Sequence, residues 1–222
     1  MSRATEAVVF DWDGTLIDSR AALLAAWHES TEAVLGRRFP ATEAEEREVF
    51  TLPGSAIWPR LAGDARELEA LAERFQQAYE RAGDLVRAFP GIPEALAALR
   101  EAGVAVGVVT SKARRRFALD AHGAGLEDAI DASVCDGDAP AAKPDPRPVR
   151  VALDRLGVSP AEAVMVGDTA VDITAGLRAG TGVMGVLWGA STEEELREAG
   201  AETLVARPGE LTVIVLRGKV AV

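Results

Sequence analysis

Cysteine and histidine are scarce in this chain of 222 residues, which holds one cysteine, Cys135, and two histidines, His28 and His122. A single cysteine cannot form an internal disulfide bond, and it suits a protein of a reducing compartment. Two histidines that lie far apart in the sequence are too few for a histidine-based zinc site. We therefore expect a cytoplasmic protein that is held together by a hydrophobic core rather than by disulfide bonds.

Long apolar runs and an excess of basic residues are also missing. No segment approaches the length of a membrane span, and Asp11 and Asp13 interrupt the apolar stretch that a signal peptide would need. The 24 basic and 35 acidic residues give a net charge of −11, whereas nucleic-acid binding needs basic stripes. We expect neither a membrane nor a nucleic acid among the partners.

The part of the chain after residue 88 alternates between strand-like and helix-like segments. Short apolar segments rich in valine predict strands at 104–109, 129–135, 163–166 and 183–187. Apolar residues spaced three or four apart predict helices at 93–102, 112–121, 146–156 and 171–179. This order predicts an α/β fold, in which a Rossmann-like parallel sheet is flanked by helices.

Residues 19–85 interrupt the alternation. They contain helical stretches at 21–35, 42–50 and 65–81, and Thr51–Arg60 is interpreted as a loop because it combines proline, glycine and tryptophan. The simplest account is a small α-helical domain, 19–85, inserted into a core domain made of 1–18 and 86–222. At the C-terminal end, the β-branched content of 211–222 suggests a strand.

Two carboxylates follow the first apolar strand signal, Ala7–Phe10, in the segment Asp11–Thr15 (DWDGT). In open parallel sheets the crevice at the carboxyl ends of the strands binds ligands. Clustering Asp11 and Asp13 there is costly unless a cation joins them, and Mg²⁺ prefers carboxylate oxygens. A carboxylate beside Mg²⁺ can also act as a nucleophile toward phosphorus. The alternative is a turn in which Asp and Gly serve backbone geometry alone.

Polar groups also follow the later strands. Thr110 and Ser111 offer hydroxyls to an anion, or a cap to the next helix. Lys143 lies between prolines, which restrict its position, and an ammonium is a good point charge for phosphate. Asp168 leaves a strand and Asp172 follows four residues later, so both can face one crevice or stabilise a helix N-terminus.

Taken in order, these four motifs (Asp-x-Asp-Gly-Thr, Thr-Ser, Lys-Pro and Gly-Asp-x-x-x-Asp) resemble the haloacid dehalogenase superfamily. The likeness covers nearly the whole chain, and the inserted helical segment matches the cap of that superfamily. The segments Lys143–Pro146 and 167–180 are especially similar to phosphoglycolate-phosphatase-type members.

The resemblance implies a role for each acidic motif. Asp11 would attack phosphorus and carry the phosphoryl group as an aspartyl-phosphate. Asp13 would protonate the leaving alcohol and then activate water. Mg²⁺ would be held by Asp11, the backbone carbonyl of Asp13 and Asp168. Asp172 would orient Lys143 or a metal-bound water.

The resemblance also implies a phosphate-binding set, which supplies hydroxyl, ammonium and backbone N–H donors to the equatorial oxygens. Its members are Thr110, Ser111, Lys143 and the backbone of Trp12 and Gly14.

Departures from other branches of the superfamily narrow the reaction. Dehalogenases lack the second aspartate of the first motif, so Asp13 disfavours that activity. Mutases carry a histidine where this chain has Leu23, and phosphonatases need a cap lysine, whereas no lysine precedes Lys112. The resemblance therefore implies a phosphatase.

The substrate is expected to be a small phosphorylated metabolite. Phosphoglycolate comes first, with pyrophosphate, sugar phosphates and nucleoside monophosphates behind it. Arg60 could meet a second anion of the substrate or be an exposed arginine of the inserted domain, while Trp27 and Trp58 are expected to pack a helical core. A phospho-accepting receiver domain and a catalytically silent homologue remain as rivals, and the protein is expected to be a monomer or homodimer.

Overall fold

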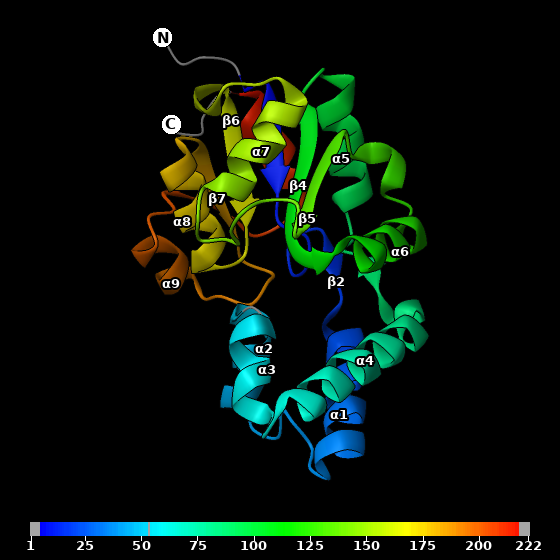
Figure 1. Cartoon of the computed structure of the whole chain (residues 1–222). Helices are drawn as coiled ribbons and strands as arrows, with labels where there is room; N and C mark the ends of the chain where they lie inside the picture. The colour runs from blue at the N-terminus through cyan, green and yellow to red at the C-terminus, as the bar shows by residue number, and fades with distance from the viewer. Residues whose placement is uncertain (1–4, 53, 218–222) are drawn as a thin grey trace. The chain divides into compact units, whose positions relative to one another are not determined.

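A six-stranded parallel sheet forms the centre of the larger of two compact units (Figure 1). The computed structural model describes residues 5–52 and 54–217. The strand order is β5-β4-β1-β6-β7-β8. The bounds are Ala7–Phe10 for β1, Ala105–Ala113 for β4, Ala132–Asp136 for β5, Ala163–Gly167 for β6, Gly182–Val186 for β7 and Thr203–Val205 for β8.

The central strands are buried on both faces because helices cover both sides of the sheet. All residues of β1, β6 and β7 are buried. The helices of this unit are α5 (Ile92–Glu101), α6 (Arg114–Ala124), α7 (Arg147–Leu156), α8 (Ala170–Ala179), α9 (Glu193–Glu198) and α10 (Pro208–Leu216). The predicted α/β fold is therefore confirmed.

The chain order reverses next to β1. From β1 the sheet continues through β4 and β5 on one side and through β6, β7 and β8 on the other. Such a switch point opens a crevice at the carboxyl ends of the strands, because the connections on its two sides run away from each other. The residues that follow β1, β4 and β6 lie at this edge.

The smaller unit comprises residues 18–87. It contains α1 (Arg20–Leu35), α2 (Glu43–Thr51), α3 (Gly54–Leu61) and α4 (Ala65–Arg81), followed by a 3-10 turn, Gly83–Leu85. Two short connecting strands, β2 (Ile17–Asp18) and β3 (Arg87–Ala88), pair with each other where the chain leaves and re-enters the larger unit. That the smaller unit acts as a cap stays a prediction.

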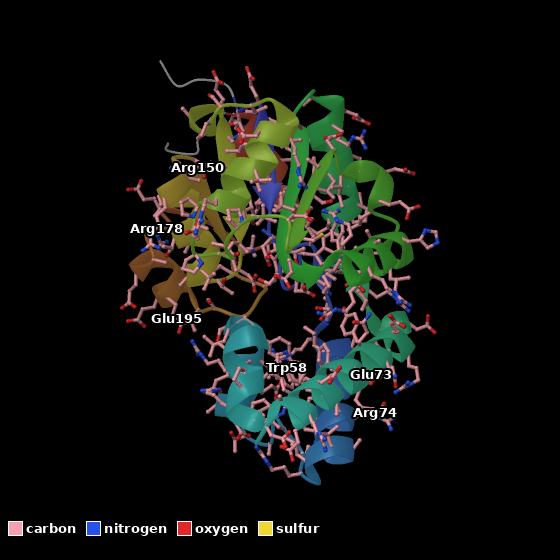
Figure 2. The ribbon with its side chains drawn as sticks, viewed as in Figure 1. Trp58, Glu73, Arg74, Arg150, Arg178 and Glu195 are labelled. Atoms are coloured by element: carbon pink, nitrogen blue, oxygen red, sulfur yellow. The ribbon has the colours of Figure 1, made fainter. Side chains whose placement is uncertain are left out.

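Aromatic side chains form the core of the smaller unit. The rings of Trp27 and Trp58 stack with centroids 4.0 Å apart, and Phe39 and Phe75 meet Trp27 edge-on. Figure 2 shows Trp58 among the side chains between these helices. Both tryptophans pack, as expected from the sequence.

Three local predictions were wrong. Most of Thr51–Arg60 is helical rather than a loop, because α2 runs through Thr51 and α3 begins at Gly54, where the packing of Trp58 outweighs the signal of Pro59. The segment after Val109 continues as strand to Ala113, so α6 starts two residues later than predicted.

Residues 208–216 form α10 instead of a strand, because Pro208 fits a first helical turn and Leu211 and Val215 bury one helical face. Residues 218–222 of that strand prediction lie outside the described residues.

The helices within the described residues, 5–52 and 54–217, are too short or too polar for a membrane. None of them combines the length and the apolar character that crossing a membrane requires.

A close helix–sheet contact at Gly176 yields a stability prediction. A β-carbon at this position of α8 would lie 2.6 Å from Cβ of Met165 and 2.8 Å from Cγ1 of Val183. Those atoms belong to the sheet, so Gly176→Ala should lower the free energy of unfolding by about 1–3 kcal/mol. Denaturant unfolding followed by circular dichroism measures this change.

The matched control is Gly123→Ala on α6, where a β-carbon meets nothing within 4 Å. It should raise the free energy of unfolding by about 0.5–1 kcal/mol, because alanine restricts the unfolded chain and favours the helix. Equal effects of the two substitutions would contradict the close packing of α8.

Candidate active site

The segment after β1 makes a tight turn that brings Gly14 against Asp168. Gly14 has a φ of +82°, which favours glycine. A β-carbon there would lie 2.4 Å from Oδ2 of Asp168. Glycine is thus required both by the turn and by the close approach of an acidic side chain that lies far away in the sequence. The N–H of Gly14 donates to the carbonyl of Ile17 at 2.9 Å, so this predicted phosphate donor is already engaged.

Asp168 follows β6 and is held at both carboxylate oxygens. Its Oδ1 accepts from the hydroxyl of Thr15 at 3.0 Å, and its Oδ2 accepts from the N–H of Ala190 at 2.8 Å. A β-carbon at Gly189 would lie 2.2 Å from Cβ of Asp168. The carboxylate therefore lies in a close-fitting recess between the loop after β1 and the loop after β7.

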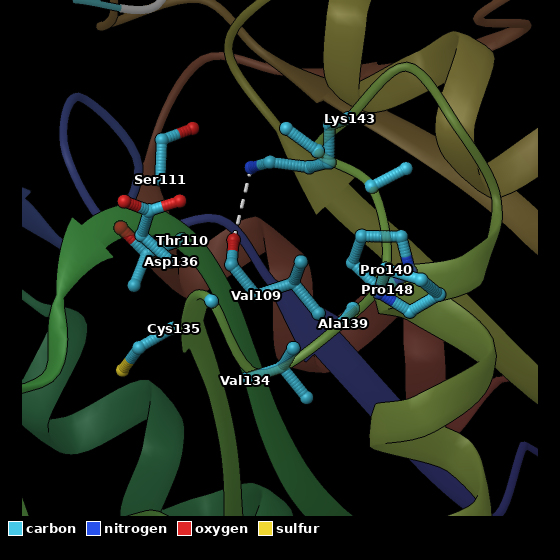
Figure 3. A pocket seen from close by; sticks show the side chains of 13 residues that line it. Val109, Thr110, Ser111, Val134, Cys135, Asp136, Ala139, Pro140, Lys143 and Pro148 are labelled. Atoms are coloured by element: carbon cyan, nitrogen blue, oxygen red, sulfur yellow. Dashed lines mark hydrogen bonds between the residues drawn. The ribbon is translucent and has the colours of Figure 1, made fainter.

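Lys143 links three elements through its ammonium group. It donates to Oδ1 of Asp11 at 2.5 Å, to Oδ1 of Asp172 at 2.6 Å and to the carbonyl of Val109 at 2.9 Å. Figure 3 shows the side chain pointing at the Val109 carbonyl. These contacts match the three N–H donors of an ammonium. These three bonds hold the ammonium between the end of β1, the strand β4 and the start of α8.

Asp172 serves the helix and the cluster together. Its Oδ2 accepts from the N–H of Thr169 at 3.1 Å and from the Thr169 hydroxyl at 2.6 Å, as part of a capping box of α8. Its Oδ1 receives the bond from Lys143. The two interpretations weighed for Asp172, helix stabilisation and orientation of Lys143, both describe the structure.

The carboxylates of Asp11, Asp168 and Asp172 form one buried cluster, with one oxygen of each lying within 4.8 Å of the others. Burial raises the pKa of Asp11. Burial and then the charge of Asp172 raise the pKa of Asp168 to about 7. Burial opposes the charge of Lys143, but attraction to Asp11 and Asp172 outweighs it and raises the lysine pKa.

The charge of this cluster fits a divalent cation. Three carboxylates and one ammonium leave a formal charge of −2, and the donors are all hard oxygens of the kind that Mg²⁺ prefers. The side chain of Asp13 is not part of this acidic group, because it makes an ion pair elsewhere. The resemblance predicts that Asp13 binds Mg²⁺ through its backbone carbonyl and not through this side chain, so the ion pair does not affect that prediction.

Asp13 meets a second lysine, Lys112, which the sequence motifs do not include. Nζ of Lys112 donates to Oδ1 of Asp13 at 2.7 Å and also to Oδ2 of Asp120 on α6. Lys112 and Asp120 are both buried. The only signal in the sequence was the scarcity of lysine, since the chain has three, at positions 112, 143 and 219.

Thr110 and Ser111 line a cavity of about 180 Å³ that Lys143 also borders (Figure 3). The alternative role of their hydroxyls as a helix cap is wrong, because α6 begins after Ala113 without a side-chain cap. The Thr110 hydroxyl oxygen instead accepts the N–H of Lys112 at 3.1 Å. Apolar side chains, among them Val134 and Pro140, form the rest of the wall.

Arg60 belongs to the smaller unit and is exposed there. Its guanidinium pairs with Glu48 of the same unit. That Arg60 meets a second anion of the substrate stays a prediction.

Some residues of the site could not be predicted, because their partners lie far away in the sequence. Thr15 bonds a carboxylate 153 positions away, and Asp120 meets Lys112 from a helix face. Gly189 and Ala190 follow β7, where the sequence offered no acidic or basic residue to draw notice.

Comparison with models of known protein families identifies the class of hydrolase to which this fold and this arrangement of acidic residues belong. The model of the haloacid dehalogenase-like hydrolase family matches residues 8–186. The chain therefore belongs to this family, and the resemblance inferred from the four motifs is confirmed.

Three curated relatives carry three different substrate names. The chain is 34% identical to the N-acetylmuramic acid 6-phosphate phosphatase of Pseudomonas aeruginosa, over 93% of this chain and 92% of that one. It is 36% identical to the phosphoglycolate phosphatase of Xylella fastidiosa (90% and 89%) and 33% identical to pyrophosphatase PpaX of Bacillus velezensis (82% and 83%). The crystal structure of a hydrolase from Pseudomonas syringae matches with a TM-score of 0.83 and 27% identity, over 97% of this chain and 99% of that one.

Lys143 should be the main electrostatic support of the cluster. Lys143→Met leaves three buried carboxylates without their ammonium, so the free energy of unfolding should fall by about 3–5 kcal/mol. Denaturant unfolding measures the change.

The control is Arg197→Met, which removes an exposed pair with Glu193 on α9 and should change stability by less than about 0.5 kcal/mol. A Lys143→Met protein as stable as the control would contradict the electrostatic role of this lysine.

Proposed function

We propose that this protein is a Mg²⁺-dependent phosphatase, which hydrolyses a small phosphate monoester through an aspartyl-phosphate on Asp11. The observation that carries the proposal is the cluster at the carboxyl ends of β1 and β6, where Asp11 meets Lys143 beside Asp168 and Asp172. A nucleophilic carboxylate next to an ammonium, with a formal charge of −2 to be neutralised, is suited to phosphoryl transfer.

In the first step a carboxylate oxygen of Asp11 attacks phosphorus. The bond between phosphorus and the ester oxygen breaks, its electron pair goes to that oxygen, and Asp13 supplies the proton that makes the leaving alcohol. Mg²⁺, held by Asp11, Asp168 and the Asp13 carbonyl with Asp172 beside them, would neutralise charge on the phosphoryl oxygens.

In the second step Asp13 takes a proton from water, and the water oxygen attacks phosphorus. The bond to Asp11 breaks, which restores the carboxylate and releases inorganic phosphate. The net reaction consumes one water for each ester and needs no other reactant. The exposure of the Asp13 side chain, 29%, supports this role, because the group can reach both an alcohol and water.

Phosphate binding falls to Thr110, Ser111 and Lys143, with the backbone of Trp12. All three side chains line one cavity. A phosphate oxygen that binds Lys143 must replace or share one of the three acceptors that the ammonium already has. Residues 18–87 would act as the cap, which excludes water while the leaving group departs.

Phosphoglycolate is our first candidate substrate, and the name of the relative from Xylella fastidiosa supports it. Pyrophosphate and a sugar phosphate follow, supported by the names of the relatives from Bacillus velezensis and Pseudomonas aeruginosa. A nucleotide phosphatase and a catalytically silent homologue are further alternatives. Phosphate release from a panel of these compounds with Mg²⁺ separates them. We also propose a cytoplasmic location and a monomeric or homodimeric state.

Asp11→Asn tests the nucleophile. Because an amide is a poor nucleophile, kcat for p-nitrophenyl phosphate should fall by on the order of 10⁴-fold or more, with the fold retained. Phosphate release and circular dichroism measure the two properties, and acid-quenched wild type should carry a phosphoryl group on the peptide that contains Asp11.

The matched control is Asp154→Asn on α7, an exposed aspartate of the same unit, which should keep the wild-type rate. Wild-type activity in Asp11→Asn would overturn the nucleophile assignment, and a wild type that never turns over would favour the silent homologue.

Gly189→Ala tests the metal assignment. Its methyl group must displace Asp168, whose Cβ would lie 2.2 Å away. Binding of Mg²⁺ to the folded state raises the melting temperature of a protein. Millimolar MgCl₂ should therefore raise the melting temperature of wild type more than that of Gly189→Ala.

Gly209→Ala is the control, because a β-carbon there meets nothing within 4 Å, and it should respond to MgCl₂ as wild type does. An equal response of all three proteins would place the cation elsewhere.

A further inference from the structure

We propose that Lys112 is a positioning residue that holds Asp13 ready for proton transfer, and that Asp120 holds Lys112. This inference rests on the proposed function, since it assigns Asp13 the role of proton donor. It begins from a contact that joins residues 99 positions apart, between Nζ of Lys112 and Oδ1 of Asp13.

The side chains of Asp120, Lys112 and Asp13 contact one another in this order, and the last of them is the most exposed. The Asp120 and Lys112 side chains are 3% and 4% exposed, whereas that of Asp13 is 29% exposed. Burying an ion pair brings little net stability, because desolvation offsets the attraction. A buried pair whose far end reaches the partly exposed carboxylate at the strand end is therefore better explained by positioning than by stability.

The end of strand β4 directs the Lys112 side chain into the interior. The strand β4 continues beyond Val109, and along this extension Thr110 and Lys112 are buried while Ser111 between them is exposed. Side chains alternate along a strand, so Thr110 and Lys112 share one side. The N–H of Lys112 also donates to the Thr110 hydroxyl oxygen.

Helix α6 supports the loop after β1 through two of its side chains. Asp120 and Phe117 lie three residues apart and are both buried on one face of the helix. Asp120 binds Lys112, and Phe117 meets the ring of Trp12 edge-on with centroids 4.8 Å apart. Trp12 lies between Asp11 and Asp13, so α6 fixes the loop that carries both carboxylates.

The chemical consequence concerns which oxygen of Asp13 transfers the proton. An ammonium has donors and no acceptor. The bond from Lys112 to Oδ1 leaves Oδ2 of Asp13 as the oxygen that can face the leaving group, and it fixes the direction in which that oxygen points. Arginine would not replace Lys112, because a planar guanidinium does not fit where a compact ammonium meets two carboxylates.

Leaving-group dependence distinguishes positioning from a purely structural role. An alkyl phosphate needs a proton donor to expel its alcohol, whereas p-nitrophenolate leaves without one. Lys112→Met should lower kcat/KM about 10- to 100-fold for phosphoglycolate and β-glycerophosphate, but less than about threefold for p-nitrophenyl phosphate. The ratio kcat/KM reports only the steps up to loss of the leaving group.

Two further variants keep the test valid if Lys112→Met folds poorly. Lys112→Met with Asp120→Asn removes both buried charges and should give the same selective loss. Asp120→Asn alone keeps the Lys112–Asp13 contact but loosens its anchor, so the selective loss should be smaller. Asp154→Asn, matched in chemistry and exposed, should show none.

The outcomes separate the two proposals. Equal losses on aryl and alkyl phosphates, or wild-type rates on both, in a folded variant would overturn the positioning role and leave the phosphatase standing. A wild type that hydrolyses none of these phosphates would overturn the proposed function and this inference with it.

Discussion

The contact between the Lys143 ammonium and the carboxylates of Asp11 and Asp172 constrains most of the structure around it. The carboxylates of Asp11, Asp168 and Asp172, buried with one oxygen of each within 4.8 Å of the others, repel one another, so a cation must lie among them when they are charged. That requirement fixes the end of β1, the end of β6, the start of α8 and the loop that carries Lys143 relative to one another. The parallel strand order brings these ends to one edge, and the ammonium lets them remain there.

The distribution of lysine and arginine follows the same logic. The chain has three lysines among 24 basic residues, and Lys112 and Lys143 are both buried against carboxylates. Arginines such as Arg60 and Arg197 make exposed pairs instead. A compact ammonium can approach two carboxylates in a confined space, whereas a guanidinium needs a planar partner and more room. The two described lysines therefore lie in buried acidic clusters, whereas these two arginines lie at the surface.

Sequence patterns predicted the groups whose signal is local. Asp11, Lys143 and Asp168 each follow a strand or lie between prolines, and the alternation of strands and helices gave the α/β fold. The partners of these groups were missed because pairing is set by tertiary structure: Lys112 reads as the start of a helix until β4 is seen to extend to Ala113. The helical Thr51–Arg60 segment failed for the same reason, since the stacking of Trp58 on Trp27 outweighs local proline and glycine signals.

In the proposed reaction, the two lysines position the groups that act at its two ends. Lys143 contacts the carboxylate proposed to attack phosphorus, and Lys112 contacts the one proposed to protonate the leaving group. Charges fixed before the substrate arrives need no reorganisation during the reaction, which is where electrostatic catalysis gains most. In the proposed reaction all of these groups are assigned to the phosphoryl group and its ester oxygen. The proposal therefore leaves discrimination among phosphoglycolate, pyrophosphate and sugar phosphates to residues outside this cluster, in line with the different substrate names of three relatives.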